Sequence, residues 1–335
     1  MSCGFTPEAE RRNRFRYRFR SPHHSSRRSA VLADSPPPTA ARVRKRPAWT
    51  AVLAAFVLVV TGLYAAATQV GADRTTTTGA EVVRVAEFLA ECPYSHRLPD
   101  DPIVAPGLPG ASHMHSFFGS RVTNANTTVT NLLGSASTCN PTVDTSAYWV
   151  PTLYRNDQPV EPTGTTFYYL GEGVRDDIIQ RTQPLPQGLR IVAGNAKATS
   201  ATDPSSVARW SCLWHGEVNP SKDFVTCPAD SYLESYLDFP QCWNGRDLDS
   251  ADHKSHMAYP VGGACPASHP VPVPKLRQVL RYPVTGATQG LRLASGAGYT
   301  MHADFFNAWP AAEMARRTTN CIQAIVKCGA DGNPS

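Results

Sequence analysis

The chain has 335 residues, and its formal net charge of +5 averages two unlike parts. Residues 1–46 carry twelve Lys/Arg against three Asp/Glu, which leaves nine positive charges, whereas the remainder carries 20 basic and 24 acidic residues. The overall positive charge therefore does not indicate a nucleic-acid-binding domain, and we expect no nucleic acid partner.

The first 46 residues predict a basic, disordered cytoplasmic tail. They contain few aliphatic side chains that could form a core. Arg and aromatic residues alternate over Arg14–Arg20, a pattern that can bind RNA. Attraction to the anionic inner leaflet of a membrane explains the same charge, and we favour it because an apolar segment follows.

Residues 47–72 predict a transmembrane signal-anchor helix. They contain no charged residue and would span roughly 39 Å as a helix, enough to cross a bilayer with some tilt. Trp49 and Tyr64 suit the membrane interfaces, which argues against a buried core helix. The basic flank places the N-terminus in the cytoplasm and everything after residue 72 outside, as a single-pass protein with the lipid bilayer as partner. A secretory signal cleaved near Ala65-Ala66-Ala67 is the alternative.

Eight of the nine cysteines follow the predicted helix, and an even number in an exported segment indicates four disulfides. Eight cysteines allow 105 pairings, and the sequence does not choose among them. A zinc site is the weaker interpretation, because no CxxC pair is present. The predicted disulfide cysteines are Cys92, Cys139, Cys212, Cys227, Cys242, Cys265, Cys321 and Cys328.

After a linker at 73–84, residues 85–328 predict one disulfide-stapled extracellular domain, followed by a tail at 329–335. Short runs rich in Tyr, Trp, Val, Leu and Thr alternate with Gly and Pro, which indicates a mainly β fold of the sandwich or jelly-roll type. The predicted strand segments are Thr145–Tyr154, Thr165–Leu170, Leu189–Val192, Arg209–Trp214, Leu276–Val284 and Leu291–Ala294.

One helix is predicted near the C-terminus. Pro310 suits its first position, and apolar residues recur at helical spacing from Met314 to Ile325. We expect Cys321 and Cys328 to hold this helix in place.

Three segments concentrate polar chemistry: Ser112–Gly119, Asp252–Pro260 and His302–Trp309. Candidate catalytic residues within them are His113, His115, His253, His256, His302, Asp252 and Asp304, and candidate ligands of a divalent metal ion are His113, His115 and His302.

Spacing favours some of these groupings. His113 and His115 would share one face of a strand about 7 Å apart, where two imidazoles can share a metal ion. His302 and Asp304 suit a strand in the same way, whereas His253 and His256 would converge only on a helical turn. A metal site, a metal-free acid/base or sugar-binding pocket, and a structural hydrogen-bond network all remain open, because imidazole serves each of them.

Other patterns are less specific. Asp247, Asp249 and Asp252 could serve as glycosidase carboxylates, but a solvated turn explains them better. Trp149 and Trp243 would stack on sugar rings if exposed, although such residues more often fill a β core. No GxSxG, Walker A, GxGxxG or HExxH motif is present, which removes the commonest hydrolase, nucleotide and zinc-peptidase readings.

The ordered blocks across residues 85–328 resemble an exported family known as domain of unknown function 1996. The blocks are Cys92-Pro-Tyr-Ser-His-Arg97, Asp101-Pro-Ile-Val104, Ser112-His-Met-His115, Phe118-Gly119, Ser146-Ala-Tyr-Trp-Val-Pro151, Gly188-Leu-Arg190, Phe239-Pro-Gln-Cys-Trp243, Asp252-His253, Ser255-His-Met257, Cys265-Pro266 and His302-Ala-Asp-Phe-Phe-Asn307. The resemblance implies a secreted or surface protein of actinobacterial or fungal type. Fungal members beside carbohydrate-binding modules hint at cell-wall polysaccharide, by analogy rather than by mechanism.

Two functional hypotheses follow. The first is a membrane-anchored extracellular hydrolase or lyase on cell-wall glycan, with a metal ion or acid/base histidines assisted by Tyr259 or Asp304. It requires His113 and His302 to lie within about 12 Å of each other, since metal–ligand bonds are near 2 Å. The second is a non-catalytic envelope module that binds glycan or scaffolds partners, with structural histidines and an exposed platform at Trp149 or Trp243.

Overall fold

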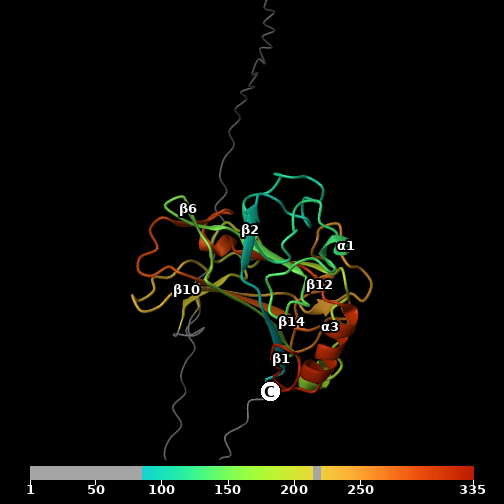
Figure 1. The fold of residues 1–335 in the computed structure, drawn as a ribbon. Helices are drawn as coiled ribbons and strands as arrows, with labels where there is room; N and C mark the ends of the chain where they lie inside the picture. The colour runs from blue at the N-terminus through green and yellow to red at the C-terminus, as the bar shows by residue number, and fades with distance from the viewer. Residues whose placement is uncertain (1–84, 214–219) are drawn as a thin grey trace, which may run out of the picture. The chain divides into compact units, whose positions relative to one another are not determined.

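Short antiparallel strands are the main regular secondary structure of the chain that the computed structural model describes, which is residues 85–213 and 220–335 (Figure 1). This part is mainly β, as predicted, and each of the six predicted strand segments overlaps an observed strand. The strands are β1 (Glu87–Glu91), β2 (Tyr94–Leu98), β3 (His115–Gly119), β4 (Ala147–Pro151), β5 (Leu153–Arg155), β6 (Gln158–Val160), β7 (Gly164–Leu170), β8 (Arg190–Gly194), β9 (Arg209–Cys212), β10 (Leu233–Asp238), β11 (Cys242–Trp243), β12 (Met257–Ala258), β13 (Val271–Pro272), β14 (Lys275–Tyr282), β15 (Leu291–Leu293) and β16 (His302–Phe306).

The predictions for the N-terminal region lie outside the described residues. They concern the tail at 1–46, the membrane helix at 47–72 and the linker at 73–84. Among the residues that are described, no helix combines the length and apolar character needed to cross a membrane.

Two five-stranded antiparallel sheets dominate the described part. Sheet I has the order β1-β7-β14-β10-β9, and sheet II has the order β2-β3-β4-β16-β8. Strands distant in sequence lie next to each other in both sheets, so β16 is placed between β4 and β8. Two three-stranded sheets, β12-β11-β13 and β15-β5-β6, complete the β structure of the described chain.

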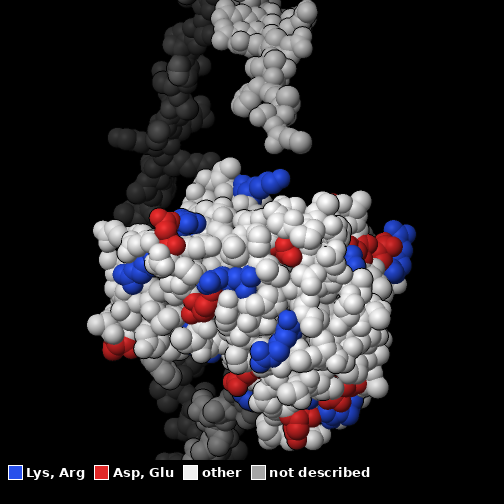
Figure 2. Space-filling model, turned by 45° about the horizontal axis from the view of Figure 1, so that its top comes forward, with Lys and Arg blue, Asp and Glu red and all other residues white. Residues whose placement is uncertain are grey.

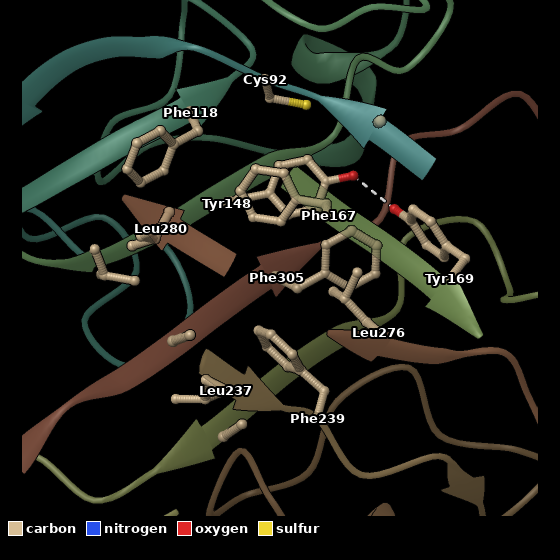
Figure 3. Packing of buried hydrophobic residues seen from close by; sticks show 14 of the residues in the cluster. Cys92, Phe118, Tyr148, Phe167, Tyr169, Leu237, Phe239, Leu276, Leu280 and Phe305 are labelled. Atoms are coloured by element: carbon tan, nitrogen blue, oxygen red, sulfur yellow. Dashed lines mark hydrogen bonds between the residues drawn. The ribbon is translucent and has the colours of Figure 1, made fainter. Parts of the chain in front are cut away.

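The main core joins the two large sheets. Tyr148 of sheet II stacks on Phe167 of sheet I with ring centroids 3.8 Å apart, and its hydroxyl lies 2.6 Å from that of Tyr169. Figure 3 shows these rings between the strands, together with Phe118 and Phe305 of sheet II. Burial of so much aromatic surface supplies the principal stabilisation of the domain.

A smaller core covers the opposite face of sheet II. Because side chains alternate along a strand, the neighbours of Phe118 and Tyr148 point away from the main core. Phe117, Trp149 and Phe306 form this second cluster, and Ile103 from the loop between β2 and β3 covers it. Both faces of sheet II are therefore buried, at least over its central strands.

The C-terminal helix α3 (Ala311–Arg317) forms where it was predicted and continues into a π-helical segment, η2 (Thr318–Gln323). Pro310 occupies the N-cap position and not the first helical position, a shift of one residue. Its extended ψ of 128° places it just before the helix. The remaining short helices are α1 (Val129–Leu132), α2 (Asp176–Ile179) and η1 (Gly298–Thr300).

All eight predicted cysteines form disulfides. The pairs are Cys92–Cys139, Cys212–Cys227, Cys242–Cys265 and Cys321–Cys328. The last pair joins η2 to the chain end, and Cys328 in turn donates its backbone N–H to Glu87 in β1. The C-terminal segment accordingly lies beside β1 (Figure 1).

Charges of opposite sign lie next to each other on the face drawn in Figure 2, with no extended patch of one sign. Many of the charged groups form ion pairs, among them Arg277 with Asp238 and Arg281 with Glu234. Such pairs also explain why β10 was not among the predicted strands, because Glu234 and Asp238 are charged and find their arginine partners only across the sheet.

Candidate metal centre

Strand order brings two of the predicted histidine segments to one place on sheet II. His115 begins β3 and His302 begins β16, with β4 between these strands. Both side chains lie on the face of the smaller core, because Phe118 and Phe305, which alternate with them, occupy the main core. His113, two residues before β3 begins its pairing, completes the group.

The three imidazoles converge on one point. Nε2 of His302 lies 3.2 Å from Nε2 of His113 and 3.4 Å from Nε2 of His115. One nitrogen from each ring lies within 4.8 Å of the others. The criterion of about 12 Å for a shared metal ion is met with a wide margin.

Backbone carbonyls set the tautomers of two of these rings. Nδ1 of His115 lies 2.9 Å from the carbonyl oxygen of Asp100, and Nδ1 of His302 lies 3.0 Å from that of Thr300. A carbonyl only accepts, so each Nδ1 must carry the proton and each Nε2 presents a lone pair. Two lone pairs thus face each other at 3.4 Å, which repel unless a cation or a proton lies between them.

Burial keeps the three rings uncharged. It lowers the pKa of His113, lowers that of His302 to about 3, and lowers that of His115 well below its ordinary value. The neighbouring imidazoles lower the pKa of His115 and of His302 further. A proton is therefore poorly held between the rings, and neutral imidazole is the form that binds metal ions.

The nitrogen separations match those of a metal ligand set. Three imidazole nitrogens bonded at about 2.0–2.1 Å to a tetrahedral ion lie roughly 3.3 Å from one another. The observed 3.2 and 3.4 Å fall on either side of that separation. Hydrogen bonds from the far nitrogen to backbone carbonyls are also the usual support for a ligating histidine.

Asp304 lies behind the imidazoles and is fully buried. Neither of its carboxylate oxygens has a hydrogen-bond partner among the described residues. One oxygen of Asp304, one of Asp101 and one nitrogen of His115 lie within 4.8 Å of one another. Burial and the nearby Asp101 raise the pKa of Asp304 well above its ordinary value.

A cavity of about 340 Å³ opens beside this group. His113, His302 and Asp304 line one part of it, and His253 and Lys254 line another. The Lys254 ammonium donates to the carbonyl oxygen of Gly194 at 2.5 Å and so is held at the cavity. A small molecule entering the cavity would therefore meet the imidazoles directly.

The third predicted segment reaches the same cavity in part. Asp252 and His253 line it. His256 does not: it is fully buried, and its two ring nitrogens lie 2.9 Å from Ser250 Oγ and 2.6 Å from the carbonyl oxygen of Arg190. Both nitrogens of His256 are thus engaged in holding the segment 249–257.

Tyr259 is placed away from this group. Its hydroxyl donates to the carbonyl oxygen of Asp238 at 2.9 Å, and it is not among the residues that line the cavity.

The predicted aromatic platform is not formed. Trp149 is fully buried in the smaller core, because it lies between the neighbouring strands β3 and β16 under the loop that carries Ile103. Trp243 is half-buried, and its indole N–H donates to the carbonyl oxygen of Asp247. Asp247 itself belongs to the turn that was predicted.

Three residues of the cavity region were not included among the predicted site residues. Asp101 lies in one of the sequence blocks that resemble the family, and this position is what could have indicated it as a site residue. Lys254 lies between two candidate histidines. Asp249, whose carboxylate lies 3.0 Å from Nδ1 of His253, was assigned to a solvated turn because nothing in its spacing distinguishes the two roles.

A further group with ligand-like spacing, Cys92, Cys139 and Asp144, is not a metal site. Its two sulfur atoms are joined in a disulfide and have no thiolate to offer.

Comparison with known proteins gives a family and no activity. No curated protein and no solved structure matches the chain. A family model described as "Domain of unknown function (DUF1996)" matches residues 101–309, which include each histidine and aspartate of the site. Since the match covers more than half of the chain, the protein belongs to the DUF1996 family.

Proposed function

We propose that this protein is an exported, membrane-anchored hydrolase or lyase that acts on cell-wall polysaccharide through a divalent metal ion held by His113, His115 and His302. The observation that carries the proposal is the convergence of the three Nε2 atoms, two of them with their protons fixed on the opposite ring nitrogen.

The donor set favours a particular group of metals. Three neutral imidazoles suit Zn²⁺ and the neighbouring transition metals, whereas Mg²⁺ and Ca²⁺ prefer oxygen ligands. Three protein ligands leave a fourth position open, as in catalytic zinc sites. The adjoining cavity of about 340 Å³ gives water and substrate access to that position. The ion would supply a Lewis acid and a water of lowered pKa.

The surroundings of the ligands suit catalysis better than a purely structural role. A structural zinc site is closed by a fourth protein ligand. Here the further candidate ligands are Asp101 and Asp304. Their carboxylate oxygens lie within 4.8 Å of a ring nitrogen of His115, but they do not form such a group with His113 or His302. The open side faces the cavity, which His253 and Lys254 also line.

The exported location and the membrane anchor belong to the same proposal. Four disulfides within the described residues are typical of an oxidising compartment. The uncharged segment 47–72 would anchor the chain, and the basic residues before it would stay in the cytoplasm.

For the architecture we infer a β-sandwich. Side chains of sheets I and II meet in one core, with Tyr148 stacked on Phe167 and Tyr169 edge-on to Phe305. Facing antiparallel sheets that share a core define this class.

The polysaccharide part of the proposal has its own grounds. It rests on the expected extracellular location and on the carbohydrate-binding modules that lie beside fungal members of the family. Neither Trp149 nor Trp243 adds an exposed platform for sugar rings. The metal centre is consequently the part to test first.

The test is the metal content of the purified full-length chain. We expect about one equivalent of a transition metal per wild-type chain after equilibration with Zn²⁺ and desalting, and less than a tenth of that in the His113→Ala/His115→Ala variant. His269→Ala is the matched control, because His269 is half-buried, does not line the cavity, and has its ring nitrogens 2.9 Å from Ser268 Oγ and 2.9 Å from the carbonyl oxygen of Ser255. Equal zinc in the wild type and the double variant, with both folded by circular dichroism, would contradict the proposal.

A further inference from the structure

His253 is placed in the cavity by a chain of supporting side chains. Its Nδ1 lies 3.0 and 3.2 Å from the two carboxylate oxygens of Asp249. Asp249 is itself paired with Arg190 at 3.1 Å, and the Arg190 guanidinium lies 4.6 Å from the ring centroid of Phe306. The carboxylate fixes the proton on Nδ1, so Nε2 is left as an acceptor.

The backbone around His253 supports the same orientation. His253 has a φ of +58°, in the left-handed region that non-glycine residues seldom adopt. Asp252 accepts hydrogen bonds from the backbone N–H groups of Lys254 and Ser255 and from Ser250 Oγ. With His256 bonded at both nitrogens, two of the residues predicted to be catalytic instead hold the loop that presents His253.

Nε2 of His253 has no hydrogen-bond partner among the described residues, whereas the ring lines the cavity that His113 and His302 also line. A base oriented by a carboxylate and set beside an open metal position is the arrangement that activates water. The Asp249–His253 pair therefore complements the proposed metal ion without being one of its ligands.

The carboxylates of the cavity do not suit cleavage of a glycosidic bond. Glycosidases use two carboxyl groups about 5–9.5 Å apart on opposite sides of the bond. Asp101 and Asp304 are both buried, and Oδ1 of Asp101 already accepts hydrogen bonds from the backbone N–H groups of Ile103 and Val104. Asp252 is committed to three hydrogen bonds within its own loop. A metal ion with an imidazole base instead suits attack of water on an acyl carbon.

We propose that the site hydrolyses acyl substituents, such as O-acetyl esters on a polysaccharide, with His253 as the general base and then the general acid, and Asp249 as its positioning residue. This inference rests on the proposed metal centre. The water oxygen bonds to the acyl carbon while its proton moves to Nε2 of His253. The acyl carbon–oxygen bond then breaks, and the same proton passes to the departing alcohol oxygen. Ester and water give acid and alcohol, with no change of oxidation state.

The test uses p-nitrophenyl acetate as the probe and the zinc-loaded full-length chain. We expect metal-dependent hydrolysis in the wild type, a loss of about 10²-fold in His253→Ala, and a smaller loss in Asp249→Asn. Imidazole added to His253→Ala should restore part of the rate, which a merely structural role would not allow. Zinc content should be unchanged in both variants, and His269→Ala should behave as wild type.

The outcomes separate this inference from the proposed function. Absence of zinc from the wild type would overturn both. Bound zinc without hydrolysis of the ester, full activity in His253→Ala, or loss of zinc from that variant would overturn the role of His253 and leave the metal centre in place. Turnover of p-nitrophenyl β-glucoside in place of the acetate would overturn the assignment of the acyl bond.

Discussion

At the scale of single residues, the site depends on which ring nitrogen of His115 and of His302 carries the proton. The carbonyl oxygens of Asp100 and Thr300 accept hydrogen bonds from Nδ1 of His115 and Nδ1 of His302. The lone pairs on the two Nε2 atoms therefore face each other. In a hydrogen-bond network without a metal ion, one of those nitrogens would be expected to donate to the other. The facing lone pairs of His115 and His302 favour a ligand set, which residue spacing alone did not.

Asp144 offers a separate test of how buried carboxyl groups behave in this core. It is fully buried and accepts a hydrogen bond from Tyr148, and desolvation raises its pKa to about 6 despite that bond. Its contribution to stability is therefore fully present below the ordinary pKa near 3.8 and is lost as the pH rises through about 6.

The measurement is the unfolding free energy of the wild type and of Asp144→Asn between pH 3 and pH 8. We expect the difference, wild type minus variant, to fall by about 3 kcal/mol over this range, since each unit of pKa shift corresponds to about 1.36 kcal/mol. Parallel profiles for the two proteins would show that Asp144 ionises in the folded protein as it does in the unfolded chain.

Residue identity singled out the histidines that converge in the structure better than it singled out the carboxylates around them. His113, His115 and His302 stand out because histidine is uncommon and is concentrated in short segments. Asp249 and Asp101 do not stand out, because a carboxylate in a turn looks the same in sequence whether it faces solvent or orients an imidazole. His256 was grouped with the others since its two structural hydrogen bonds depend on tertiary contacts with Arg190.

At the scale of secondary structure, the position of His302 depends on the pairing of β16 with β8. Gly194 is the partner of His302 in that register and has a φ of +87°. A Cβ atom at Gly194 would lie 2.7 Å from the Met301 carbonyl oxygen and 2.9 Å from Cα of His302. The absence of a side chain at this position is what allows β8 and β16 to approach each other beside His302.

Gly194→Ala should accordingly displace His302 by disturbing the pairing of β8 with β16. We expect a loss of about 2 kcal/mol or more in unfolding free energy, because both strain and contact are introduced, and a weaker affinity for Zn²⁺ by competition with a chelator. Gly134→Ala is the matched control: its φ is +74°, but no atom lies within 4 Å of the added Cβ, so it should lose about 1 kcal/mol and keep its zinc affinity. Equal zinc affinity in the two variants would show that the register at β8 does not position His302.

Alternating and β-branched patterns predicted strands such as β7 and β14, whose inward residues are apolar. They did not predict β10, because Glu234 and Asp238 alternate with its buried residues and find arginine partners only across the sheet. The order of the strands within each sheet could not be predicted from the sequence either. His115 and His302 are 187 residues apart in sequence, and only the placement of β4 between β3 and β16 brings them together.

At the scale of the whole molecule, the two buried faces of sheet II differ in the side chains that they carry. The face toward sheet I is packed with aromatic rings, whereas the other face combines the smaller core with the imidazoles and the cavity. A sheet supported from behind by a rigid core is a suitable base for a preorganised ligand set. Four disulfides among the described residues join the segments around this frame.

The most direct test of the metal centre is X-ray absorption spectroscopy of the zinc-loaded, full-length protein. We predict a first shell with three imidazole nitrogens at about 2.0–2.1 Å, completed by a non-protein oxygen, and loss of this shell in the His113→Ala/His115→Ala variant. A first shell built from sulfur or carboxylate ligands, or an unchanged spectrum in the variant, would contradict the assignment of His113, His115 and His302 as the ligands.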